Sequence, residues 1–273
     1  MSQALGLQSM LFVPGNRPER FAKALASGAD LVCIDLEDAV PADAKDAARA
    51  AALDAARGDP RYAIRINGLT TRDGLADLLA LATADYRPPL ILIPKVEAAH
   101  EIVIARSVIV DVGFVPLIET VKGLACADAI AAEAQVVMMM FGGGDLSAQL
   151  GVALAWDPLF VARSQFVMAC AGAGVPAMDV PFTHLNDTDG LRVEAEKAKA
   201  LGFAAKSAIH PAQIEVLHSV FRPSAEAIAE AYEARDAFKA SGGAAVRFKG
   251  KMLEAPFMRA YEHVIAIGEK TNA

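Results

Sequence analysis

Short apolar segments typical of buried β-strands alternate with alanine-rich segments of helical character from the N-terminus to about residue 222. The pattern predicts strands over Met10–Val13, Leu31–Asp35, Ala63–Ile66, Leu90–Ile93, Phe114–Ile118, Val136–Phe141, Ala177–Val180 and Ala204–Ile209. It predicts helices between them over Pro18–Ser27, Pro41–Arg57, Gly74–Ala82, Ala98–Arg106, Val121–Ala134, Phe160–Gly172 and Asp189–Leu201. Helices between buried strands require crossover connections and hence parallel pairing. Eight such strands favour a closed (β/α)8 TIM barrel over an open doubly wound sheet, which periodicity alone leaves as the alternative.

The C-terminal part of the chain has a different character. Pro223 and Ser224 open an alanine-rich helix, Ser224–Ala240, which the glycine-rich stretch Ser241–Gly243 ends. The remaining residues, Val246–Ala273, predict a short strand or lid segment followed by a last helix. We therefore expect a barrel domain over residues 1–222 and a helical and lid extension over 223–273, both parts of one structural unit.

Composition narrows the class of protein. The 273 residues are 54% hydrophobic, which excludes intrinsic disorder, and the net charge of −7 argues against nucleic-acid or anionic-membrane binding. Mean hydropathy is positive, but the longest apolar stretches reach only about a third of the ~20 residues that a spanning helix needs. The N-terminus lacks the features of a secretory signal, and three scattered cysteines fit reduced thiols. We expect a cytoplasmic protein.

Polar residues follow most of the predicted strands. In a βα barrel these positions all lie on one rim, where active sites are built. The sequence therefore predicts a catalytic or binding mouth formed by Pro14–Arg17, Asp35–Asp38, Arg65, Asn67, Lys95, Glu119, Gly142–Asp145 and His210.

Three residues of this rim form a chemically specific set. Glu119 and Asp145 end consecutive strands, and two carboxylates without a histidine or cysteine cluster suit Mg²⁺ completed by water and substrate oxygens. The guanidinium of Arg65 suits a substrate carboxylate. A metal-chelated 2-keto acid held by an arginine is the arrangement that stabilises an enolate. The alternative is that Glu119 forms a buried ion pair with Arg65 or Lys95.

The glycine run before Asp145 lacks the spacing of a nucleotide-binding loop and has no P-loop lysine. Gly143 and Gly144 instead indicate a close approach of the backbone to substrate or metal. Arg17 and Arg20 follow the first strand and could hold a phosphate-bearing cofactor at the rim, although Arg20 alone fits a solvated helix position.

Seven segments of the chain, in order and over nearly its whole length, resemble the citrate lyase β-subunit family within the HpcH/HpaI aldolase superfamily. They read SMLFVPGNRPERFAKAL, ADLVCIDLEDAV, IRIN, ILIPKVE, LIETVKG, FGGGDLSAQLG and AKSAIHPAQIEVLHSVFRPS. The resemblance implies a TIM barrel, trimeric or hexameric, that binds Mg²⁺ and acts on acyl-CoA or acyl-carrier thioesters. It implies cleavage or formation of a short 3-hydroxyacyl thioester of citramalyl, malyl or citryl type, with a 2-keto acid and an acyl thioester as the other partners.

The resemblance also implies residue roles. The metal ligands of the family match Glu119 and Asp145, and its substrate-carboxylate arginine matches Arg65. A catalytic aspartate, which the family places over a neighbouring subunit's site, is replaced here by Glu254, whose extra methylene could displace the carboxyl by about 1 Å. Asp35 and Glu37 are expected to order the basic groups of the site. Contacts to substrate or cofactor are expected from Arg17, Lys95, Asn67, Gly143 and Gly144.

Other functions fit the same residues. A thioesterase would use the site with water as the nucleophile, and an aldolase for hydroxy-keto acids would work without CoA. A CoA-ester-binding protein could keep the mouth and lose the acid/base group at position 254. The length of the chain resembles the short, stand-alone members of the family, which makes citrate itself a poor first choice of substrate.

Overall fold

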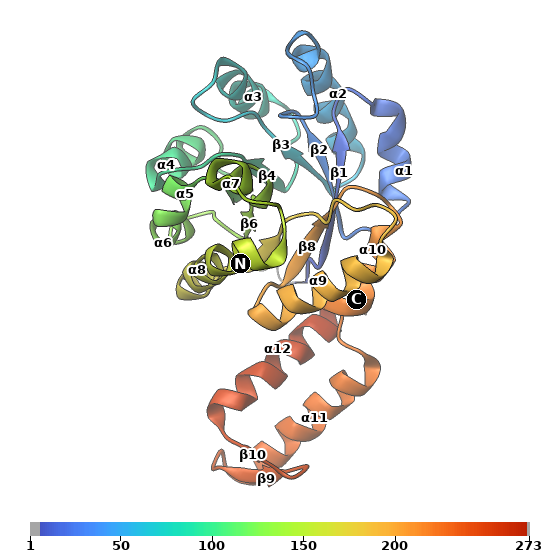
Figure 1. The fold of residues 1–273 in the computed structure, drawn as a ribbon, viewed down its shortest axis with the longest axis vertical. Coiled ribbons are helices and arrows are strands. Elements are labelled where there is room, and N and C mark those ends of the chain that lie inside the picture. Colours follow the sequence, from blue (N-terminus) through green and yellow to red (C-terminus); the bar gives the residue numbers. More distant parts are fainter. Residues whose placement is uncertain (1–5, 272–273) are drawn as a thin grey trace. The chain divides into compact units, whose positions relative to one another are not determined.

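Eight parallel strands close into a barrel in the computed structural model, which describes residues 6–271 (Figure 1). The strands pair in chain order, and β1 closes the barrel by pairing with β8 in the register Met10↔Ser207. This confirms the predicted (β/α)8 barrel. The strands are β1 (Ser9–Pro14), β2 (Leu31–Asp35), β3 (Tyr62–Arg65), β4 (Leu90–Ile93), β5 (Gly113–Ile118), β6 (Met139–Phe141), β7 (Ala177–Asp179) and β8 (Ala205–Ala208).

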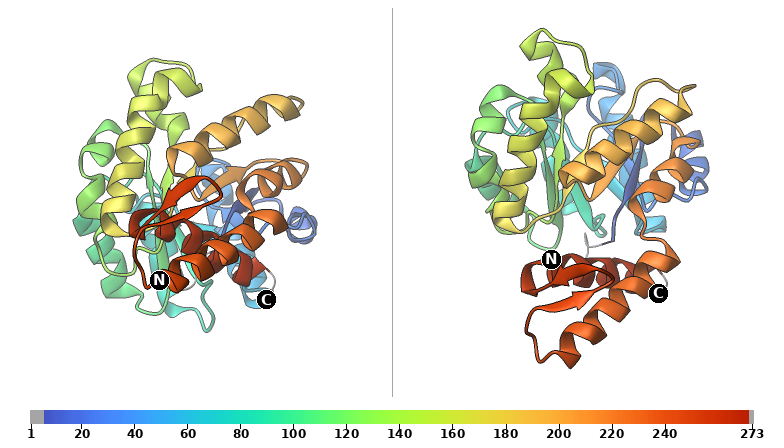
Figure 2. Two further views of the ribbon diagram at one scale, coloured as in Figure 1. Left: turned by 90° about the horizontal axis from the view of Figure 1, so that it is seen from below. Right: turned by 60° about the horizontal axis from the view of Figure 1, so that its bottom comes forward.

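Helices follow the strands and surround the barrel, as both views of Figure 2 show. They are α1 (Phe21–Leu25), α2 (Lys45–Gly58), α3 (Arg72–Thr83), α4 (Ala99–Val108), α5 (Val121–Ala125), α6 (Ala127–Ala131), α7 (Gly143–Leu150), α8 (Trp156–Ala173), α9 (Thr188–Leu201) and α10 (Gln213–Phe221). Short 3₁₀ turns, Pro18–Arg20 and Ala42–Ala44, precede α1 and α2.

Several boundaries differ from the prediction for local reasons. The predicted helix over 121–134 breaks at Cys126, whose backbone is not helical, and so forms α5 and α6. Asp189, where the predicted helix begins, lies inside α9, because the side chain of Asp187 accepts the Gly190 N–H and the helix starts one residue earlier, at Thr188. The glycine run, over which no helix was predicted, begins α7 and so places Asp145 in the first helical turn.

The barrel interior is filled by alternate residues of each strand. Successive side chains of a strand point to opposite faces, so positions two apart share the interior. The buried side chains there are small or flexible apolar groups, four of them methionines. They are Met10, Leu31, Cys33, Ala63, Leu90, Leu92, Val115, Leu117, Met138, Met140, Met178 and Ala205.

The chain divides into two compact units, residues 1–218 and 219–273. The division falls within α10, four residues before the expected boundary at 222. The second unit contains α11 (Ala225–Ala240), the antiparallel hairpin β9 (Val246–Phe248) and β10 (Lys251–Leu253), and α12 (Ala255–Thr271). Its helices pack side by side around a small core that includes Ala234, Leu253 and Met258 (Figure 1).

Over residues 6–271, none of the helices combines the length and the apolar character needed to cross a bilayer.

Candidate active site

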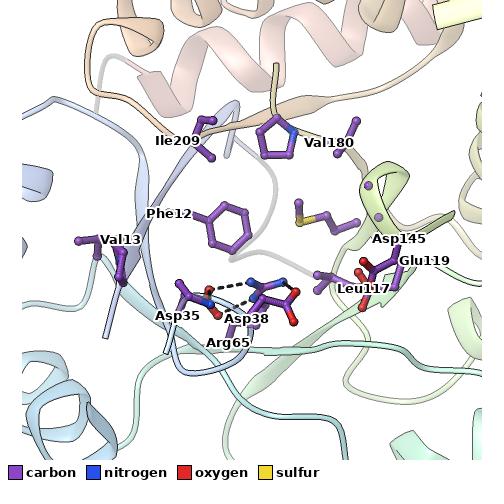
Figure 3. Close-up of a pocket in the computed structure, with 16 residues that line it drawn as sticks. Phe12, Val13, Asp35, Asp38, Arg65, Leu117, Glu119, Asp145, Val180 and Ile209 are labelled. Atoms are coloured by element: carbon purple, nitrogen blue, oxygen red, sulfur yellow. Dashed lines mark hydrogen bonds and ion pairs between the residues drawn. The ribbon is translucent and has the colours of Figure 1, made fainter. Parts of the chain in front are cut away.

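The inward positions of the strands continue past the apolar core into a polar cavity at the carboxyl ends. Asp35 comes two residues after Cys33, Arg65 two after Ala63, and Glu119 two after Leu117, so the same alternation that fills the barrel aims these side chains inward. The cavity has a volume of about 320 Å³ (Figure 3). Its lining combines these polar groups and Asp38, Gly142, Gly144 and Asp145 with the side chains of Phe12, Val13, Pro14, Ala39, Leu117, Met140, Val180, Pro181 and Ile209.

Arg65 is held by acidic partners on β2 and the following loop. Its Nε and Nη2 donate to the two oxygens of Asp35, each at 2.7 Å, and its Nη1 lies 2.9 Å from Glu37 Oε2 (Figure 3). Burial disfavours the guanidinium, but the bonds to Asp35 outweigh it and hold the pKa of Arg65 above its ordinary value. Since a guanidinium has five N–H donors, Arg65 retains donors for a ligand carboxylate while its orientation is fixed.

Lys95 connects the acidic residues of the cavity rim. Its backbone has a positive φ of 54°, an uncommon conformation for a residue with a side chain. The Lys95 N–H donates to Glu119 Oε1 at 2.7 Å, and its ammonium lies 2.5 Å from Glu37 Oε1 and 3.3 Å from Asp145 Oδ2. Glu119 and Asp145 therefore both contact Lys95, and the predicted metal ligands lie on one side of the cavity (Figure 3).

These contacts differ from the predicted alternative, in which Glu119 forms a buried ion pair with Arg65 or Lys95. Glu119 accepts from the backbone of Lys95, whereas the Lys95 ammonium and the Arg65 guanidinium pair with other carboxylates.

The negative charge of the Glu119 carboxylate is poorly compensated by its surroundings, and a bound cation would compensate it. Its side chain is only 5% exposed, and burial, followed by the charge of Glu37, raises its pKa to about 8. Asp145 is 44% exposed and adds to that effect. Carboxylate oxygens are the donors that hard divalent cations prefer, so the pair fits such a cation with water or substrate completing the shell. Residues 6–271 contain no cluster of three or more acidic, histidine or cysteine ligands.

Comparison with known proteins identifies the family of the chain. Residues 8–211 match the model of the family described as HpcH/HpaI aldolase/citrate lyase. The chain belongs to this family. The match confirms the resemblance seen in the sequence motifs and covers the barrel with all the cavity-lining residues.

Relatives in the HpcH/HpaI family differ in their reactions. An L-malyl-CoA/beta-methylmalyl-CoA lyase of Cereibacter sphaeroides is 32% identical over 96% of this chain and 95% of its own. A (3S)-malyl-CoA thioesterase of the same species is 34% identical over 81% of this chain and 79% of its own. The crystal structure of CitE from Mycobacterium tuberculosis, in complex with magnesium, acetoacetate and coenzyme A, is 37% identical. It covers 96% of this chain and 98% of its own with a TM-score of 0.81.

The remaining predicted residues of this HpcH/HpaI protein lie in several places. Gly144 lines the cavity, whereas Gly143 is buried behind it, where an added Cβ would come within 3.1 Å of Val180. Arg17 is exposed and pairs with Glu19 at 2.7 Å. Glu254 belongs to the second unit, between β10 and α12.

Asn67 lies behind the cavity, in a polar cluster that sequence reasoning missed. Its backbone and side-chain N–H groups donate to the buried Asp77, and its Oδ1 accepts from Lys45 at 2.7 Å. Lys45 also donates to the carbonyls of Leu36 and Glu37, each at 2.6 Å. Asn67 is therefore bonded to Lys45 and Asp77 and does not line the cavity, where a contact with substrate or cofactor was predicted. Lys45, at the start of α2, fixes the loop that carries Glu37.

Gly142 lies directly against Glu119. A Cβ built on Gly142 would overlap Glu119 Cβ and lie 2.7 Å from its Oε2. Any side chain at this position must displace the carboxyl that the cavity depends on.

Gly142→Ala is therefore expected to lower kcat/KM by roughly 10²-fold, because misplacing a positioned group by about 1 Å has effects of that size. Steady-state kinetics checks this, with thermal unfolding to confirm that the variant folds. Gly172→Ala is the matched control, since a Cβ there meets no atom within 4 Å in α8. Equal activity of the two variants would contradict the inferred role of the Gly142–Glu119 contact.

Proposed function

We propose that this protein is a Mg²⁺-dependent carbon–carbon lyase that cleaves or forms a short 3-hydroxyacyl-CoA thioester bearing a carboxylate. The observation that carries the proposal is the meeting of Glu119, Asp145 and a rigidly held Arg65 in one cavity of about 320 Å³. The malyl-CoA lyase relative and the CitE complex with magnesium, acetoacetate and coenzyme A support it.

Cleavage requires a defined movement of electrons and protons. The bond between C2 and C3 of the acyl chain breaks, and its electron pair forms the enolate of the departing acyl thioester. The C3 hydroxyl loses its proton and becomes the carbonyl of a 2-keto acid, and the enolate takes up a proton at C2. Condensation is the same sequence reversed, so one site serves both directions.

The protein's residues divide these tasks. Arg65 binds the substrate carboxylate with the donors that Asp35 leaves open, and the Asp35 and Glu37 contacts keep its plane fixed. Lys95 holds Glu119 in place through its backbone N–H. The apolar side chains of Leu117, Met140 and Val180 exclude water from the reacting carbons.

Glu119 and Asp145 would hold the Mg²⁺, which supplies electrostatic stabilisation to negative charge that develops at the keto-acid end of the substrate. Two features make the pair suitable for Mg²⁺: the Glu119 carboxyl is buried with its negative charge poorly compensated, and all the donors are oxygens.

A second groove, which adjoins the cavity, suits the phosphates of the thioester carrier. Its volume is also about 320 Å³, and it shares Phe12, Val13, Pro14 and Ile209 with the first. Arg20 and Lys23 line it. We assign the phosphate contact to these two residues in place of Arg17, which does not line this groove.

Glu254 is proposed as the acid/base group that exchanges the C2 proton. Following the family resemblance, in which this group lies over a neighbouring subunit's site, we propose that a second copy of the chain supplies it within a homotrimer or homohexamer.

Product analysis tests the proposed reaction. Incubating malyl-CoA with the protein and Mg²⁺ should release glyoxylate and acetyl-CoA, measured by chromatography and by trapping of the keto acid. Chelation with EDTA should stop the release, and Mg²⁺ should restore it. Free malate with CoA would instead favour a thioesterase, the activity of one relative. Binding of malyl-CoA without turnover would favour a non-catalytic CoA-ester-binding protein.

A further inference from the structure

A buried ion network lies on the outer face of β7 and β8, outside the cavity. Asp179 and Lys206 belong to the outward series of these strands, because Met178 and Ala205 point inward. Asp179 Oδ1 accepts from Arg163 Nε of α8 at 2.9 Å, and its Oδ2 accepts from Lys206 Nζ at 2.6 Å. Lys206 also donates to Glu194 of α9 at 2.8 Å. Two cations thus balance two carboxylates, and Arg163, Asp179 and Lys206 are fully buried.

The third hydrogen bond of Lys206 reaches the cavity wall. Its ammonium donates to the carbonyl of Val180 at 2.7 Å. Val180 and Pro181 line the cavity, and Figure 3 places Val180 on the side opposite the Asp35–Arg65 pair. An ammonium has three N–H donors, and these three contacts use all of them. The buried ammonium of Lys206 therefore fixes the backbone at Val180, which forms part of the cavity wall.

Val180 also packs against the helix that carries Asp145. The methyl Cγ1 of Val180 lies so close to Gly143 that an added Cβ there would meet it at 3.1 Å. Gly143 is the first residue of α7, and Asp145 lies two residues later in the same turn. A shift of Val180 would therefore move the surface that α7 rests on.

We propose that Lys206, oriented by Asp179, is a positioning residue that holds the Val180 carbonyl and thereby sets the wall of the keto-acid site. The proposal rests on the proposed function for its ligand. Apolar side chains in place of a buried ion pair are often equally or more stabilising, so stability alone does not account for this network, and its bond to the Val180 carbonyl is the feature that reaches the cavity. Burial disfavours the Asp179 carboxylate, but Lys206 and Arg163 outweigh it and keep its pKa below the ordinary value, so the network stays charged.

Two variants separate positioning from charge balance. Lys206→Met removes the donor, and the double variant Lys206→Met/Glu194→Gln removes it together with one carboxylate, which leaves Arg163 and Asp179 as a balanced pair. Glu194→Gln alone is the control, because Lys206 keeps Asp179 and Val180.

The first measurement does not depend on the reaction. Trp156 is the chain's single tryptophan, and it lines a small cavity of about 130 Å³ with Pro181 and Phe182. Acrylamide quenching of its fluorescence should increase in both Lys206 variants by more than in the control Glu194→Gln, because Glu194 lines the same cavity but does not hold the Val180 carbonyl. Equal quenching in the wild type and the double variant, with both folded by thermal unfolding, would overturn the proposal.

The second measurement is the Kd of pyruvate in the presence of Mg²⁺, by calorimetry. The double variant should bind about tenfold more weakly, because the wall at Val180 and Pro181 is displaced from the ligand, and its KM for the keto acid should rise in parallel. A purely structural role would reduce the active fraction and kcat without changing Kd or KM, and that outcome would also overturn the proposal. If the wild type bound no pyruvate with Mg²⁺, the proposed function would fail, and the quenching result would still decide whether Lys206 holds the wall.

Discussion

Replacing Glu119 with glutamine is expected to lower kcat/KM by about 10²–10³-fold, the range for removing one preorganised electrostatic contact to developing charge. Glutamine has the same shape as glutamate, and its amide oxygen can still accept the Lys95 N–H, so the backbone at Lys95 should keep its conformation. What the variant loses is the negative charge that would hold Mg²⁺. Calorimetric titration with Mg²⁺ should therefore show much weaker binding, while the melting temperature without metal stays at or above that of the wild type.

The control for this variant is Glu133→Gln. Glu133 carries the same group, pairs with Arg106 at 3.8 Å and is not among the residues that line the cavity. It should keep wild-type turnover. Metal-dependent turnover that survives undiminished in Glu119→Gln would remove Glu119 from the metal site and with it the main support for the proposed lyase.

Arg65→Lys is expected to have a comparable effect for a different reason. Lysine keeps the positive charge but cannot form the two parallel bonds to Asp35 or present a planar fork to a substrate carboxylate. We expect kcat/KM to fall by roughly 10²-fold or more, as for other misplaced catalytic contacts. Because Asp35 and Glu37 lose the guanidinium that they share, the free energy of unfolding should also decrease. The decrease should be at most the ~3–5 kcal/mol that breaking a buried ion pair costs.

Arg61→Lys provides the comparison for Arg65→Lys. Arg61 also pairs with an aspartate, Asp59, at 2.7 Å, but its side chain is 50% exposed, so the same substitution there should change stability by under ~1 kcal/mol. Chemical denaturation and steady-state kinetics on both variants measure the difference. Equal losses at the two positions would show that Arg65 does nothing beyond an ordinary surface arginine.

Sequence periodicity predicts the part of the site that follows the barrel interior. Asp35, Arg65 and Glu119 continue the inward series of their strands, so a period of two and a parallel barrel suffice to bring them to one cavity. The sequence predicts Asp145 on the rim where the cavity lies, but not the helix that holds it, because glycines favour loops and the tight contact of Gly142 with Glu119 is a tertiary effect.

Residues that act from behind the cavity could not be predicted in the same way. Lys206 lies within an apolar strand, and Lys45 lies in an alanine-rich helix, where a lysine ordinarily faces solvent. Their partners are 8 to 27 residues away in sequence, and only the fold brings them together. A charged residue in the outward series of a buried strand is the one signal that could have indicated Lys206.

The methionines of the barrel interior have a consequence for the range of substrates. Met140 lines the cavity, and Met138 and Met178 lie with it in the apolar core beneath. An unbranched thioether side chain changes its rotamer at little cost, so a floor made of such groups yields to acyl chains of different size without any change in sequence. We therefore expect the cavity to admit acyl chains of more than one size, which would make this barrel a ready starting point for a change of specificity.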